Sequence, residues 1–149
     1  MLLRGDAAMV DDIAGITVRA FRHDDRHDRE MMEAFIESLP DEDRDEADLA
    51  DGVPDEHVLI AIDADGVVAF ASERPFDFAP DYGDIAVATR PDARGRGLGR
   101  LAVDRLCTEI VERGMQPLYR HGTCNLGSGR LSASLGFRRV LELRACAPS

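Results

Sequence analysis

A glycine-rich stretch at residues 91–100, Pro-Asp-Ala-Arg-Gly-Arg-Gly-Leu-Gly-Arg, carries the residue types that most clearly suggest binding chemistry. Its glycines stand at alternate positions, where they allow a tight turn and a close approach of the main chain to a ligand. An amphipathic segment follows, so the unbonded N–H groups and the positive dipole end of a new helix would face the turn. Such a turn binds phosphate groups, and Arg94, Arg96 and Arg100 add positive charge.

The spacing of these glycines is neither G-x-G-x-x-G nor G-x-x-x-x-G-K-[ST], so the two common nucleotide-binding fingerprints are absent. Taken alone, the stretch could also be an ordinary strand-to-helix turn with solvated arginines.

Two further groups of residues are weaker candidates for a functional site. Cys124 with His121 could form a nucleophilic pair, although a buried structural thiol is the favoured interpretation. His23 and His27 have the i, i+4 spacing of a metal pair, but the glutamate of H-E-x-x-H is missing and aspartates surround them. We therefore expect no metal.

The composition limits the class of partner. The net charge is -11, with 29 acidic residues against 18 basic ones, all of them arginine. This balance argues against nucleic-acid binding, which needs a positive face. The acidic surface favours solubility, and the alternative is attraction of a cationic amine. There is no apolar run for a signal peptide or membrane span, and the three cysteines form no disulfide framework, so we expect a cytoplasmic protein without membrane contact.

The remaining sequence predicts the elements that position the glycine-rich turn. Apolar runs and alternation predict strands at residues 16–21, 58–62, 67–73, 84–89, 117–120 and 137–144. Helical periodicity predicts helices at residues 25–38, 98–113 and 128–135, and the acidic segment 41–51 is a short helix or a loop. Asp65-Gly66 predicts a hairpin, and residues 1–12 are an extension that adds little. This mixture of helices and strands fits one α/β domain over residues 1–149.

Two signatures together resemble those of the GCN5-related N-acetyltransferases, the GNAT family. The first is Arg94-x-x-Gly97-x-Gly99 after a strand and a proline. The second is Asn125, then Ser128, Leu131 and Gly136-Phe137 at the family's spacing. Many relatives carry Tyr where this chain has Ser132, so the chain resembles a branch with Asn and Ser instead. The resemblance is strong over residues 58–143.

The resemblance implies the acyl-CoA N-acyltransferase fold: mixed α+β, with a single, mostly antiparallel sheet splayed at the cofactor strand and about four helices. It implies acetyl-CoA as co-substrate and direct acetyl transfer to a primary amine, which we expect to belong to a small molecule. Whether the protein forms a homodimer is left open. The cofactor-binding residues implied by the resemblance are Ile85, Ala86, Val87, Ala88, Thr89, Arg94, Gly95, Arg96, Gly97, Leu98, Gly99, Arg100, Asn125 and Ser128.

The resemblance also implies a general base, because an alkylammonium of pKa about 10 must lose a proton before it attacks. Asp84 is the first candidate and Glu73 the second, although either could be a solvated acid. With Ser132 in place of the usual phenol, the leaving thiolate could be protonated by Tyr119, Ser128 or water, or leave unassisted.

Three other functions stay open at this stage. The acceptor could be a protein N-terminus or a lysine. The domain could be a non-catalytic acyl-CoA-binding module, which the loss of the tyrosine favours. A nucleotide-binding domain of different chemistry is a further alternative.

Overall fold

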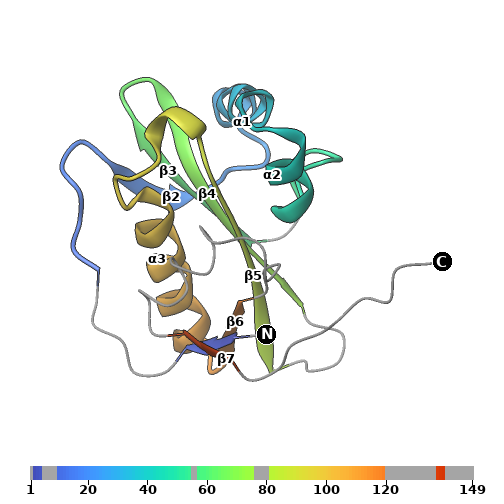
Figure 1. The fold of residues 1–149 in the computed structure, drawn as a ribbon, viewed down its shortest axis with the longest axis vertical. Helices are drawn as coiled ribbons and strands as arrows, with labels where there is room; N and C mark the ends of the chain where they lie inside the picture. Colours follow the sequence, from blue (N-terminus) through green and yellow to red (C-terminus); the bar gives the residue numbers. More distant parts are fainter. Residues whose placement is uncertain (1, 5–9, 55–56, 76–80, 120–136, 140–149) are drawn as a thin grey trace.

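The computed structural model describes residues 2–4, 10–54, 57–75, 81–119 and 137–139. These residues form one seven-stranded sheet flanked by helices (Figure 1). In sheet order the strands are β2 (Thr17–Ala20), β3 (His57–Asp63), β4 (Gly66–Pro75), β5 (Tyr82–Thr89), β6 (Gln116–Tyr119), β1 (Leu2–Arg4) and β7 (Phe137–Arg139). Only β5 and β6 pair in parallel, and the other neighbours are antiparallel. The expected mixed, mostly antiparallel fold is confirmed.

The centre of the sheet is the β3–β4 hairpin, which turns at Asp65-Gly66 as expected. Gly66 has φ 128°, a conformation that side chains disfavour, and the Asp63 carboxylate accepts a hydrogen bond from the Asp65 N–H at 2.7 Å. Both faces of this hairpin are covered, so the apolar residues of β3 and β4 are buried throughout their middle.

Helices α1 (Arg26–Ser38) and α2 (Asp41–Glu46) lie on one side of the sheet. Asp25 caps α1 by accepting a hydrogen bond from the Asp28 N–H at 2.9 Å. The buried side chains Met32 and Phe35 of α1 belong to one core cluster with Phe70 of β4. Figure 1 shows α3 on the opposite side.

Helix α3 (Leu98–Glu112) connects the parallel strands β5 and β6, as such a pair requires. Its buried face carries Leu101, Leu106 and Ile110, and Cys107 is buried beside them. Gly114 follows with φ 76° and ends the helix. The helix predicted at residues 98–113 is thereby confirmed.

The first strand was not expected. Leu2–Arg4 lies between β6 and β7 and is antiparallel to both, with Leu3 opposite Leu118 on one side and Arg138 on the other. The N-terminal extension therefore contributes a strand to the sheet instead of adding little. The predicted helix at 128–135 falls outside the described residues. Within the described part of the chain, no helix has the length and apolar character needed to cross a membrane.

Candidate acetyl-CoA site

Within the part of the chain that the structure describes, strand β5 has one edge that is only partly paired. On the β4 side its pairs run from Gly83 to Thr89, whereas on the β6 side the described pairs end at Ile85 opposite Tyr119. The Arg90 N–H donates to the Val68 carbonyl of β4 at 2.9 Å. Because main-chain groups alternate in direction along a strand, those of Val87 and Thr89 point away from β4. This edge can therefore pair with an extended ligand.

The glycine-rich turn follows this edge directly. A single 3-10 turn, Pro91–Ala93, leads into Gly95 with φ 82° and Gly97 with φ 76°. Gly97 is the N-cap of α3 and supplies no side chain to bond the first amides of the helix. Residues 94–97 are exposed, while Leu98 and Gly99 are buried. The turn thus presents main-chain N–H groups at a positive helix end, which suits a diphosphate.

The arginines of the turn have carboxylate neighbours. Arg94, with a side chain 52% exposed, is ion-paired with Asp43 of α2. Arg90 donates to Asp92 at 2.5 Å, and Arg96 is exposed. A diphosphate arriving at this turn would compete with Asp43 for the Arg94 guanidinium.

Asp84 lies near the start of β5 and is only 4% exposed. The Arg74 guanidinium stands between two carboxylates: its Nη1 donates to Asp48 at 2.6 Å and its Nη2 to Asp84 at 3.4 Å. Arg74 and Asp84 are directly opposite each other on β4 and β5. The site therefore combines a turn that suits an anion with a buried carboxylate near the start of β5.

Comparison with known proteins decides the family. Residues 20–137 match the model of the Acetyltransferase (GNAT) family. The chain belongs to the GNAT acetyltransferase family. This is a family of acetyl-CoA-dependent N-acetyltransferases, as the resemblance implied. No curated protein gave a significant match in sequence.

Solved structures share the GNAT fold. A GNAT-family protein from Novosphingobium aromaticivorans matches with TM-score 0.69 and 26% identity over 92% of this chain, which spans 56% of that protein. Ribosomal-protein-alanine N-acetyltransferase from Brucella melitensis matches with TM-score 0.62 and 22% identity, covering 82% of this chain and 84% of that one. A Salmonella typhimurium protein solved with its cofactor acetyl-CoA matches with TM-score 0.60 and 23% identity, covering 83% and 80%.

Two other predicted site residues of the acetyltransferase lie on the opposite face of the sheet from Asp84. Glu73 is opposite Ile85, and both of its carboxylate oxygens accept from Arg113 at the end of α3, one at 2.6 Å. Tyr119 of β6 is also opposite Ile85. It is 1% exposed and belongs to the core cluster under α3. Asp84 is therefore separated from both by the thickness of the sheet.

The second signature of the acetyltransferase lies outside the described residues. This holds for Asn125, Ser128 and Ser132, and also for His121 and Cys124. The two histidines of the weak metal pattern have different neighbours: the His23 ring meets Phe21 edge-on with centroids 4.9 Å apart, while His27 lines a pocket.

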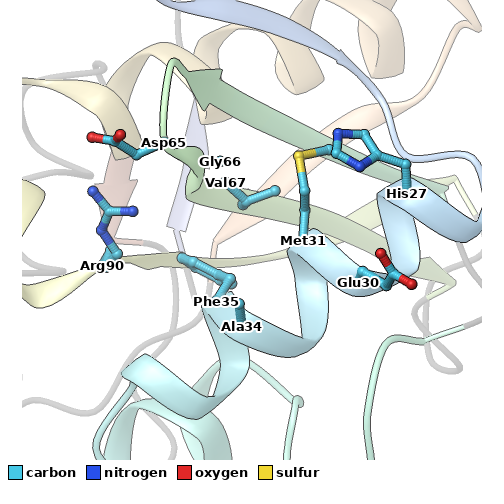
Figure 2. Close-up of a pocket in the computed structure, with 9 residues that line it drawn as sticks. All are labelled: His27, Glu30, Met31, Ala34, Phe35, Asp65, Gly66, Val67 and Arg90. Carbon is cyan, nitrogen blue, oxygen red and sulfur yellow. The ribbon is translucent and has the colours of Figure 1, made fainter.

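This pocket, of about 280 Å³, lies between α1 and the β3–β4 hairpin (Figure 2). Its lining is His27, Glu30, Met31, Ala34, Phe35, Asp65, Gly66, Val67 and Arg90. At a rise of about 3.3 Å per residue, Arg90 is about 20 Å along β5 from Asp84. Among the residues that the structure describes, the lining of this pocket therefore includes none of the predicted site residues.

The residues that sequence reasoning missed are the charged partners. Asp43, Asp48 and Arg74 approach the turn and Asp84 through ion pairs between residues 10 to 51 positions apart in the chain. Nothing in the local sequence marks them, since Asp43 and Asp48 lie in an acidic segment that resembles a solvated surface.

Proposed function

We propose that this acetyltransferase moves the acetyl group of acetyl-CoA to a primary amine of a small molecule by direct attack. The observation that carries the proposal is the exposed turn with positive φ at Gly95 and Gly97, next to the edge of β5 whose described pairs with β6 end at Ile85. The Brucella melitensis and Salmonella typhimurium proteins are 22% and 23% identical to this chain, which shows a shared fold and does not name the acceptor. The acidic composition favours a cationic amine over other small molecules.

The cofactor would lie along one continuous main-chain surface. The amides from Arg94 to Arg100 would bind the diphosphate, and the groups of Val87 and Thr89 would pair with the pantetheine arm. Asn125 and Ser128 complete this binding set by resemblance. Bound acetyl-CoA supplies the thioester carbon that the amine attacks. The Val87 N–H, on the edge of β5 beyond its described pairs with β6, would donate to the carbonyl oxygen as it gains charge.

Asp84 would be the general base. It is buried at the strand that the cofactor would follow, whereas Glu73 is held by Arg113 on the other face. Asp84 would take the proton that the amine loses as the N–C bond forms and the C–S bond breaks. Tyr119, Ser128 or water would protonate the departing thiolate. The cytoplasmic location, the homodimer and the Asn and Ser branch remain predictions from the sequence.

The test is release of free thiol from acetyl-CoA in the presence of an amine panel. We expect turnover with at least one cationic amine, and Asp84→Asn should lower kcat by about 100-fold or more near neutral pH, with recovery as the pH approaches the pKa of the amine. Glu112→Gln, an exposed change on α3, is the control for loss of one negative charge. Tight cofactor binding without turnover on any amine would instead support a non-catalytic acyl-CoA module.

If turnover occurs only with peptide amines, the acceptor is a protein N-terminus or lysine. If Asp84→Asn and Glu112→Gln have the same pH profile as the unaltered enzyme, Asp84 is not the base.

A further inference from the structure

Ser72 of β4 carries a hydroxyl group with no evident structural use. The residue is 1% exposed, and within the part of the chain that the structure describes its Oγ is buried without a hydrogen-bond partner. A buried hydroxyl that makes no hydrogen bond costs free energy, and the great majority of such groups in folded proteins have a partner. An orphan hydroxyl is therefore a reason to look for a ligand or a water.

The strand register places Ser72 beside the proposed base. Ser72 is opposite Ala86 on β5, while the next residue on the same face of β4, Arg74, is opposite Asp84. Side chains two residues apart project from the same face of a strand. Ser72 and Asp84 are thus diagonal neighbours on the face that carries α1 and α2.

This separation suits one bridging water. Diagonal cross-strand neighbours are about 7–8 Å apart, and somewhat less at Cβ, which is too far for a direct hydrogen bond between short side chains. Two hydrogen bonds through one water span about 5.5 Å. Ala86 is directly opposite Ser72, so only a methyl group stands beside the hydroxyl on β5.

We propose that Ser72 is a positioning residue that holds the water through which Asp84 deprotonates the amine. This inference rests on the proposed function, because it takes Asp84 as the base. The water would accept the amine proton and pass one of its own protons to the Asp84 carboxylate, so Asp84 becomes protonated and the water is restored. Ser72, Asp84 and the amine give this water three hydrogen bonds, the usual number for a buried water.

The test is Ser72→Ala, followed by two independent readouts. We expect kcat for the best amine to fall by roughly 10- to 100-fold, with the Kd for acetyl-CoA unchanged. We also expect Tm to stay the same or rise, because the substitution removes the unbonded hydroxyl and leaves the methylene packing. Ser72→Thr keeps the hydroxyl and should retain more turnover than Ser72→Ala.

The relay through Asp84 is tested by combining Ser72→Ala with Asp84→Asn. If both act on one proton path, the double variant should have the same kcat as Asp84→Asn alone. Full kcat in the Ser72→Ala enzyme would overturn the proposal. So would a Ser72→Ala substitution that lowers kcat by the same factor in the unaltered enzyme and in the Asp84→Asn enzyme, because the two residues would then act independently. Unchanged kcat in Asp84→Asn alone would refute the base assignment, and the relay with it.

Discussion

The buried carboxylate of Asp28 gives the most quantitative prediction. It is fully buried in the first turn of α1 and accepts from both terminal nitrogens of Arg19 at 2.6 Å. It also accepts from the main-chain N–H of Arg22 at 3.0 Å. These bonds attach α1 to β2 and to the chain between them. The hydrogen bonds from Arg19 outweigh desolvation and hold the pKa of Asp28 well below its usual range.

Asp28→Asn keeps the shape of the side chain but removes its charge. Breaking a fully buried ion pair costs about 3–5 kcal/mol, and breaking an exposed one costs about 1 kcal/mol or less. The side chains of Arg19 and Arg22 are 30% and 59% exposed, so water can partly solvate them after the change. We therefore expect a loss of about 2–4 kcal/mol in the free energy of unfolding, or a fall in Tm of roughly 5–15 °C.

The pH dependence of this loss has a definite sign. Because the pKa of Asp28 is lower in the folded than in the unfolded chain, its stabilisation is fully present above an unfolded pKa of about 3.9 and is lost as the pH falls toward the folded pKa. Urea unfolding of the two proteins should show their difference shrinking by about 1.4 kcal/mol for each pH unit below about 4.

Asp24→Asn is the matched control, since Asp24 is exposed just before α1. The reasoning is refuted if Asp28→Asn costs no more stability than Asp24→Asn, or if its cost is the same at pH 7 and pH 3.

Two predictions concern the cofactor turn. Gly97→Val should abolish acetyl-CoA binding in calorimetry and leave the fold intact. Among the described residues, the nearest atom to an added Cβ would be Ile13 Cδ1 at 3.9 Å, so we expect the destabilisation to come from φ 76° and to be about 1–2 kcal/mol. Unchanged affinity would contradict the site. Asp43→Asn should lower the Kd for acetyl-CoA by roughly two- to five-fold, because Arg94 loses its competing carboxylate. Asp45→Asn removes the same charge from α2, and an equal effect would mean that only general repulsion is involved.

The elements with strong local signals were predictable from the sequence. Asp25 begins α1 as a cap, Pro91 and the glycines follow β5, and the apolar period of α3 runs to its end. These features depend on residues a few positions apart, where propensity and capping act directly. The predicted boundaries of these elements agree with the structure to within a few residues.

The arrangement of residues around the site was harder to predict from the sequence because it depends on strand register. Glu73 and Asp84 were considered together as bases, yet they project from opposite faces of the sheet because Glu73 pairs with Ile85. A shift of one residue in register would reverse this result. The ion pairs of Asp43 and Asp48 likewise form only after α2 has packed beside the sheet.

The position of β1 has a consequence for how the protein forms during synthesis. Leu2–Arg4 is made before its two neighbours in the sheet, which end at Tyr119 and Arg139. A ribosome adds about 5–20 residues per second, so roughly 6 to 23 seconds pass between the synthesis of this strand and that of β6. During that interval the strand lacks the two partners that it has in the folded sheet, so the sheet can be completed only after β7 has been made.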